Sequence, residues 1–197
     1  METEIEAKFI NIDCDAFRKK LTEVGAKLIY PERFMKRRTY DDAGGSLRKI
    51  GGWVRVRHEG DVVTLSYKQL NDRTLHGTKE ITVEVNDFEK TCELMKAIGF
   101  VEKSYQETKR EKWVLDGAEI TIDTWPWIPT FVEIEAKDEE HIKNISTRLG
   151  FDWKDALHGS VENAYMAVYD VTEDEIDDWE EILFSPVPEW LEIKRKK

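Results

Sequence analysis

Residues 4–8 read Glu-Ile-Glu-Ala-Lys, so charged and apolar side chains alternate from the start of the chain. In a β-strand, residues two apart share a face. The three charged side chains would therefore point to one side, and Ile5 and Ala7 to the other. This alternation predicts a strand with one charged face and one apolar face.

The same design returns at residues 131–135, which read Phe-Val-Glu-Ile-Glu and place Glu133 and Glu135 on one face. The most economical reason to collect negative charge on two strands is a divalent cation, since hard cations such as Mg²⁺ prefer carboxylate oxygens. The alternative for either motif alone is a strand whose charged face is simply solvated.

Further stretches alternate in the same way, and their polar positions include bases as well as acids. These positions are Arg55 and Arg57; Thr64, Ser66 and Lys68; Glu80, Thr82 and Glu84; Arg110 and Lys112; and Thr121 and Asp123. Arginine suits phosphate oxygens because its planar guanidinium donates paired hydrogen bonds. An ordinary solvated face lacks this strand-by-strand sorting of charge.

Closing such strands into a barrel would place one face inside. Burying so many charges in a dry interior would be prohibitive, so the interior must be wet and built to receive a ligand. A polyanion on the basic side, bridged by a metal ion to the acidic side, meets both demands.

The series resembles the CYTH superfamily, the triphosphate tunnel metalloenzymes, which include class IV adenylyl cyclases, thiamine triphosphatases and inorganic triphosphatases. The resemblance runs from about residue 2 to about residue 169. The matching motifs are residues 4–8, Trp53-Val-Arg-Val-Arg57, Thr64-Leu-Ser-Tyr-Lys68, Lys79-Glu-Ile-Thr-Val-Glu84, Lys109-Arg-Glu-Lys-Trp113, Ile122-Asp123 and residues 131–135. The expected fold is α+β, a closed antiparallel β-barrel with flanking helices.

The resemblance implies Mg²⁺ or Mn²⁺ as cofactor, with Glu4 and Glu6 as the primary metal ligands. Asp123, Glu133 and Glu135 complete the acidic side, where they hold a metal or orient the nucleophile. An acid is also expected in residues 80–84, where Glu80 is favoured slightly over Glu84. The residues expected to act in catalysis are Glu4, Glu6, Lys8, Glu133 and Glu135.

The phosphate-binding residues implied in the same way are Arg55, Arg57, Lys68 and Arg110, joined by Lys8. Residues 36–40 depart from the family, because they read Lys-Arg-Arg-Thr-Tyr where Gln-x-Asp-x-Tyr is common. Arg38 then stands at the position of an acid, and it either adds a cation to the tunnel or is a neutral surface change.

A second departure concerns the lysine that the family usually has two places before Arg110. That position is Thr108 in this chain, and Lys109 or Lys112 is the candidate substitute.

The expected function is that of a metal-dependent triphosphatase acting on inorganic triphosphate, thiamine triphosphate or ATP. The first alternative is a class IV adenylyl cyclase that converts ATP to cyclic AMP and pyrophosphate. The second is a non-catalytic module that binds polyphosphate or nucleotides.

With 197 residues and a net charge of −11, the chain is not expected to bind nucleic acid or membrane surfaces non-specifically. Cys14 and Cys92 are expected to be reduced thiols, and no signal peptide or apolar run near twenty residues is present, which favours a cytoplasmic location. The protein is expected to be a monomer or a homodimer.

Three strand-then-helix units are expected, with helices in residues 13–28, 87–100 and 138–151, each opened by Asp and stopped by Gly. The tunnel domain is expected to span residues 1–170. Residues 171–197 form a tail, in which Thr172-x-x-Glu175 predicts a capping box for a helix that runs through Leu183.

Overall fold

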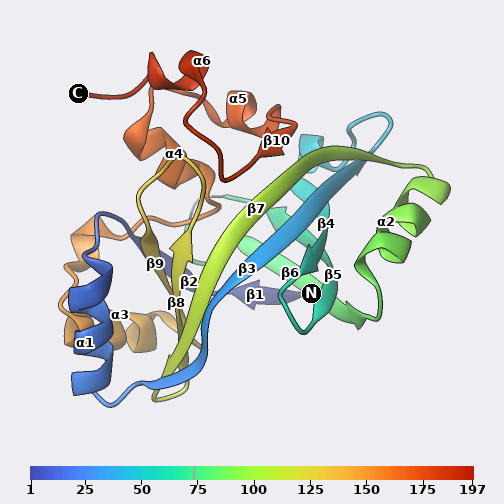
Figure 1. Cartoon of the computed structure of the whole chain (residues 1–197). Helices are drawn as coiled ribbons and strands as arrows, with labels where there is room; N and C mark the ends of the chain where they lie inside the picture. Colours follow the sequence, from blue (N-terminus) through green and yellow to red (C-terminus); the bar gives the residue numbers. More distant parts are fainter. Residues whose placement is uncertain (73) are drawn as a thin grey trace.

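The computed structural model describes residues 1–72 and 74–197 (Figure 1). The strands are β1 (Glu2–Glu4), β2 (Glu6–Phe9), β3 (Lys27–Asp42), β4 (Gly52–His58), β5 (Val63–Leu70), β6 (Thr78–Val85), β7 (Phe100–Leu115), β8 (Ala118–Thr124), β9 (Phe131–Glu135) and β10 (Glu181–Ile182). The helices are α1 (Cys14–Glu23), α2 (Phe88–Ala97), α3 (Glu139–Leu149), α4 (Glu162–Val168), α5 (Glu173–Asp177) and α6 (Glu189–Glu192), with short 3₁₀ turns η1 (Arg48–Ile50) and η2 (Trp153–Asp155). The expected α+β class is confirmed.

One antiparallel sheet runs in the order β1-β6-β5-β4-β3-β7-β8-β9-β2, and β10 adds to β7 in parallel. Its first and last strands are two pieces of the same N-terminal stretch. The piece before Ile5, β1, pairs with β6, and the piece after it, β2, pairs with β9. The two edges are thus joined by the covalent chain, and the strand ladder between β1 and β2 is open. The closed barrel expected from the sequence is therefore not confirmed.

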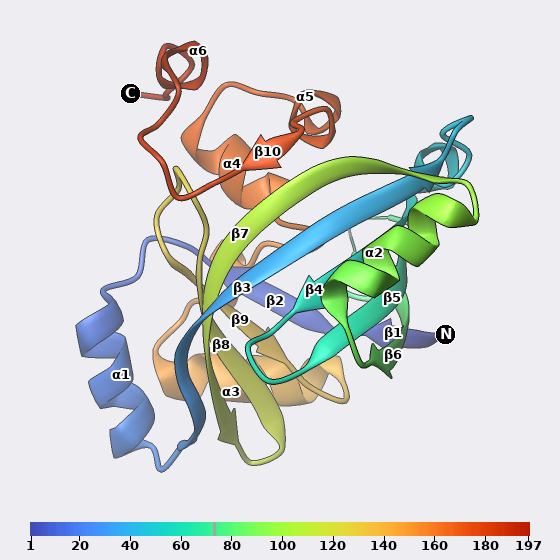
Figure 2. The ribbon, with the colours of Figure 1, turned by 45° about the vertical axis from the view of Figure 1, so that its right-hand side comes forward.

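The longest strands, β3 and β7, have 16 residues each and lie side by side across the molecule (Figure 2). Their register shifts near Tyr30, Arg33 and Tyr40, where the pairing is irregular. Such irregularities bend a strand and increase its twist. These two strands join the half of the sheet around β4 to the half around β8.

Helices α1, α2 and α3 begin where the sequence predicts, because Asp13, Asp87 and Asp138 accept hydrogen bonds from the first backbone N–H groups. Gly25, at φ +82°, follows the end of α1 in the left-handed conformation that glycine tolerates best. Helix α1 ends at Glu23, so it is shorter than expected, and Leu28 belongs to β3.

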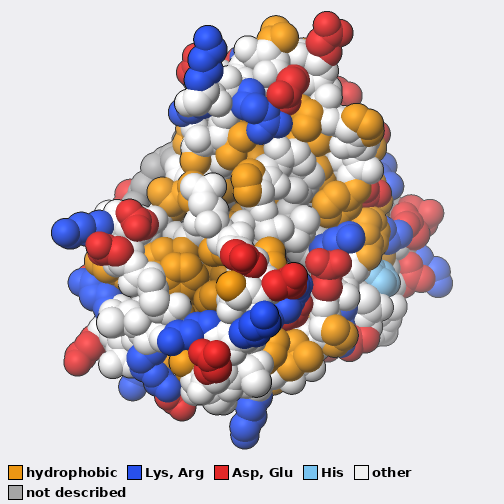
Figure 3. Space-filling model, turned by 60° about the vertical axis from the view of Figure 1, so that its left-hand side comes forward, with side chains coloured by type: hydrophobic (Ala, Val, Ile, Leu, Met, Phe, Trp, Pro, Cys, Tyr) orange, Lys and Arg blue, Asp and Glu red, His pale blue; other side chains and the backbone are white. Residues whose placement is uncertain are grey.

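The outer surface carries charges of both signs. On the face shown in Figure 3, acidic and basic side chains are interspersed with apolar ones. Within the described ranges, none of the helices is long and apolar enough to cross a membrane. The sorted charges that the sequence predicts lie on the other, inner side of the sheet.

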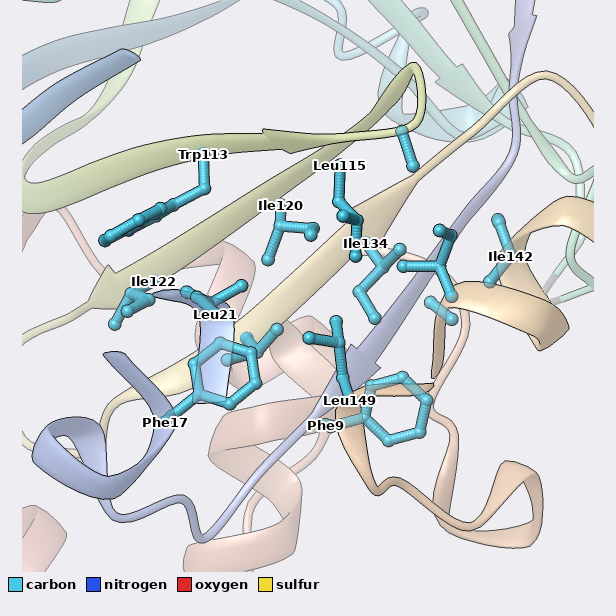
Figure 4. Packing of buried hydrophobic residues seen from close by; sticks show 14 of the residues in the cluster. Phe9, Phe17, Leu21, Trp113, Leu115, Ile120, Ile122, Ile134, Ile142 and Leu149 are labelled. Atoms are coloured by element: carbon cyan, nitrogen blue, oxygen red, sulfur yellow. The ribbon is translucent and has the colours of Figure 1, made fainter. Parts of the chain in front are cut away.

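The main core lies between the strands β2, β8 and β9 and the helices α1 and α3 (Figure 4). Ile120 and Ile134 have no exposed surface and pack against Phe17 and Leu21 of α1 and Ile142 of α3. Because strand side chains alternate, burying these residues turns their neighbours to the opposite face. The helices thus fix which side of the sheet is charged.

Two further clusters complete the packing. Helix α2 covers the outer face of β4, where Val56 packs with Phe88. Residues 171–197 pack on the inner side of the sheet through Ile176 and Leu191, in a cluster that also contains Trp125.

The capping box of Thr172 and Glu175 is confirmed in the C-terminal segment. Helix α5 nevertheless ends at Asp177 and does not reach Leu183, since residues 181–182 pair with β7 as β10. Hydrogen bonds to a strand thus replace the helical ones that the sequence predicts there.

Replacing Ile134 by Ala should lower the free energy of unfolding by about 2–5 kcal/mol, because the site has no exposed surface and would leave a cavity. Ile81→Ala is the matched control, since Ile81 is 53% exposed on β6, and should cost about 1 kcal/mol or less. Urea unfolding of both variants measures the difference. Equal losses would contradict the assignment of the core.

Candidate active site

A cavity of about 1540 Å³ lies on the inner face of the sheet. Most of the side chains singled out from the sequence line it, and they come from strands on both halves of the sheet. These residues are Glu4, Glu6, Lys8, Arg38, Arg55, Arg57, Lys68, Glu80, Arg110, Glu133 and Glu135. The alternation of charge along the strands has thus produced a charged interior.

Strand register places the acids side by side. Glu6 on β2 is opposite Glu135 on β9, and Glu135 is opposite Glu119 on β8. Like charges directly opposite one another in a sheet are destabilising. Glu119, which also lines the cavity, was not among the residues predicted from the sequence.

Lys8 is held at the centre of the acidic wall. Its Nζ lies 2.6 Å from Oε1 of Glu6 and 3.0 Å from Oε1 of Glu133, and it also donates to the carbonyl oxygen of Gly159. Burial alone would lower the pKa of Lys8, but the charges of Glu133 and Glu6 outweigh it and hold the pKa above its ordinary value. Lys8 is therefore a fixed cation.

Lys68 neutralises a second carboxylate pair. Its Nζ lies 2.8 Å from Oε2 of Glu4 and 3.2 Å from Oε2 of Glu80. Burial, together with the hydrogen bond to Glu80, raises the pKa of Glu4 to about 8. Burial alone would also raise the pKa of Glu80, but the proton of Glu4 and the charge of Lys68 lower it. Glu4 and Glu80 therefore share a proton at neutral pH. Of the two acids predicted in residues 80–84, Glu80 is the one that joins this cluster, because Glu84 is exposed.

Arg110 bridges the two predicted acids on neighbouring strands. Its Nε donates to Oδ1 of Asp123 at 2.6 Å, and its Nη2 donates to Oε2 of Glu133 at 2.7 Å. Asp123 has no exposed surface and also accepts from the hydroxyl of Thr121 at 2.5 Å. In this structure Asp123 orients Arg110 from behind the cavity wall.

The basic half of the cavity is built by β4. Arg55 donates to Glu80 at 3.1 Å, and Arg57 donates through Nε to Glu59 at 2.7 Å. Burial and the neighbouring charge of Arg57 lower the pKa of Arg55 to about 10. Glu59 follows the strand in a turn, where strand alternation gives no signal, and sequence reasoning missed it.

Two predicted cations are paired with carboxylates outside the cluster of Glu4, Glu6 and Glu135, although Arg38 also lines the cavity. Arg38 shares its face of β3 with the buried Tyr40, and its guanidinium binds Glu102, which also binds Lys96 of α2. Lys112 pairs with Glu119 and does not line the cavity.

Sequence reasoning also missed Arg37. It is the inward neighbour of Arg38 and donates to the hydroxyl of Thr108 at 2.9 Å. A signal was present, because residues two apart share a face, so that Arg38 shares the face of the apolar Tyr40 and Arg37 lies on the opposite face.

The acids suit a hard cation by donor type. In residues 1–72 and 74–197, no group of three or more His, Cys, Asp or Glu side chains is arranged to hold a metal ion. Partial burial and the charges of Glu119 and Glu6 nevertheless raise the pKa of Glu135 to about 7. A divalent cation would relieve this crowding, so the carboxylates fit Mg²⁺ or Mn²⁺.

The stability of the metal-free protein should fall as pH rises from about 5 to 8. Glu4 and Glu135, with pKa values raised to about 8 and about 7, keep protons in the native state that the unfolded chain releases near 4.5. Since the native state binds more protons in this window, raising the pH favours unfolding.

Thermal melts in EDTA measure this dependence. Glu135→Gln should flatten the slope, whereas Glu93→Gln on the exposed face of α2 should leave it unchanged. A melting temperature that rises across the window would refute the crowding of the acids.

Solved structures share this fold. A protein from Pyrococcus horikoshii superposes with a TM-score of 0.68 at 21% identity, covering 82% of this chain and 98% of its own. A protein from Vibrio parahaemolyticus described as a candidate adenylate cyclase gives a TM-score of 0.72 at 14% identity, covering 84% and 98%. A candidate adenylyl cyclase from Hippeastrum, described as having a dominant triphosphatase activity, gives 0.59 at 14% identity, covering 88% and 94%.

Comparison with curated protein sequences finds no match. The sequence pattern of the CYTH domain matches residues 2–162, which include the N-terminal Glu-Ile-Glu-Ala-Lys and the acid pair on β9. This span covers most of the chain and every strand that lines the charged cavity except β10. The chain therefore belongs to the CYTH family.

Proposed function

We propose that this protein is a metal-dependent triphosphatase. The observation that carries the proposal is the sorting of charge inside one cavity, with arginines of β3 and β4 on one wall and the acids of β2 and β9 on another. A linear triphosphate with a divalent cation matches both walls. The triphosphatase activity described for the Hippeastrum protein supports this choice over cyclisation.

In this proposal the arginines bind and orient the substrate. Phosphoryl transfer requires little covalent chemistry from the protein, and positioning and charge neutralisation supply most of the catalysis. Arg55, Arg57 and Arg110 would exchange their carboxylate partners for phosphate oxygens. Lys8 and Lys68, which are held between acids, would contact the substrate where it meets the acidic wall.

The acidic wall would hold the metal and the nucleophile. Glu4, Glu6 and Glu135 would bind Mg²⁺ or Mn²⁺, which would neutralise charge on the phosphate oxygens. Among the described residues, no basic side chain lies within ion-pairing distance of Glu135, so its carboxylate is free to bind a ligand or orient a water molecule. Glu133 holds Lys8 and Arg110 in place.

Product analysis tests this function. The purified protein is incubated with Mg²⁺ or Mn²⁺ and inorganic triphosphate, thiamine triphosphate or ATP, and the products are separated. Release of orthophosphate is expected. Cyclic AMP with pyrophosphate would establish the cyclase instead, and tight binding without turnover would establish a binding module.

Glu6→Gln should abolish turnover while the protein remains folded, because it removes a carboxylate oxygen from the metal site and leaves the shape of the side chain. Glu4→Gln should act in the same way. Orthophosphate release and circular dichroism measure activity and folding, with Glu93→Gln as the control. Full activity in both glutamate variants would overturn the metal assignment.

Arg57→Ala should lower kcat/KM for inorganic triphosphate more than about tenfold, since a charge-assisted hydrogen bond contributes about 1.5–3 kcal/mol. Arg148→Ala is the control, because Arg148 pairs with Asp116 on the surface. Steady-state kinetics measure both variants. Equal kinetics for Arg57→Ala and wild type would place Arg57 outside the site.

A further inference from the structure

Arg37 is a buried guanidinium that the proposed mechanism does not yet use. It is 6% exposed and lines the cavity. On β3 it is directly opposite Arg57 of β4. Side chains directly opposite in antiparallel strands are close neighbours, so two positive charges meet here.

Five other cations of the cavity are already paired with carboxylates. Each of Lys8, Arg55, Arg57, Lys68 and Arg110 lies within ion-pairing distance of at least one carboxylate. Arg37 differs, because no carboxylate in the described part of the chain lies within that distance of it. Its Nε is buried without a hydrogen-bond acceptor among the described residues.

Neutral groups fix the orientation of this guanidinium. Nη2 of Arg37 donates to the hydroxyl of Thr108 at 2.9 Å, and the guanidinium carbon lies 4.5 Å from the centre of the Trp125 ring. Thr108 has no exposed surface and Trp125 is 6% exposed. The side chain is thus held in one direction by groups that leave its charge uncompensated.

Without a ligand, this arrangement destabilises the native state. Burial, and then the charges of Arg55, Arg57 and Arg110, lower the pKa of Arg37 well below its ordinary value. A buried charge without a partner destabilises the native state, and an apolar side chain of similar size is often better tolerated. An anion that enters the cavity would supply the missing partner.

We propose that Arg37, oriented by Thr108 and Trp125, is a binding residue for one phosphoryl group of a condensed phosphate. The inference rests on the proposed function only for the chemical class of the anion. It gives the cavity a phosphate contact that requires no carboxylate to be displaced. It also gives a role to the buried hydroxyl of Thr108, which accepts a hydrogen bond from the arginine and holds it in place.

Arg37→Met tests the proposal, since methionine keeps an unbranched side chain against Trp125 and removes the charge. In the ligand-free protein, the melting temperature should rise, because a buried repulsion has been removed. The affinity for inorganic triphosphate, measured by calorimetry in EDTA so that no metal-dependent turnover intervenes, should fall at least tenfold. Unchanged affinity, or a lowered melting temperature without ligand, would overturn the proposal.

Thr108→Val provides a second variant that keeps the arginine and removes only its hydrogen bond. Binding of inorganic triphosphate should weaken several-fold, and wild-type affinity would count against the proposal. Arg148→Gln is the charge-matched control, because it removes one positive charge from a surface ion pair. It should leave triphosphate binding unchanged, and an equal loss there would show a non-specific charge effect and reject the assignment.

These measurements separate the two proposals. If the wild-type protein releases no orthophosphate with Mg²⁺, but Arg37→Met weakens triphosphate binding, the triphosphatase fails and the phosphate contact stands. If orthophosphate is released and Arg37→Met binds triphosphate as the wild type does, the enzyme stands and the role of Arg37 fails.

Discussion

Neutralisation of buried charge is the constraint on which this structure depends. One face of a single sheet carries carboxylates, ammonium groups and guanidinium groups, which would be costly to bury without partners. The fold meets this demand with bridged pairs, of which Lys8 between Glu6 and Glu133 is the most enclosed. Where a partner is missing, as at Arg37, or where like charges crowd, as at Glu135, the interior is prepared for a ligand of opposite charge.

The outer face of the same strands supplies the stability that such an interior requires. Ile120 and Ile134 pack under α1 and α3, and Val56 packs under α2. Each strand is thereby fixed with its charged side inward, because its side chains alternate between the two faces. The apolar core and the charged groups thus lie on opposite faces of the sheet, so ligand contacts can replace ion pairs without disturbing the apolar core.

The ion pairs indicate which contacts would change when a ligand binds. Arg55, Arg57 and Arg110 are held by carboxylates that preserve their positions. A polyphosphate would replace some of these partners, while Glu4, Glu6 and Glu135 on the acidic wall would bind a divalent cation. The same residues therefore serve as structural pairs in one state and as ligand contacts in the other, which is why removing one partner should change affinity and stability together.

Alternation in the sequence was sufficient to predict the strands and their charged faces, because period two is a local property of the extended chain, and most of the charged residues predicted in this way line the cavity. The Asp-opened helices followed from local capping in the same way. Three features depended on tertiary structure. The register between strands decided that Asp123 orients Arg110, the turn after β4 brought in Glu59, and the split of the N-terminal stretch at Ile5 left the strand ladder open. The sequence prediction named Arg38 and left its face open, and only the tertiary structure showed that Arg37 is the arginine that contacts Thr108 and Trp125.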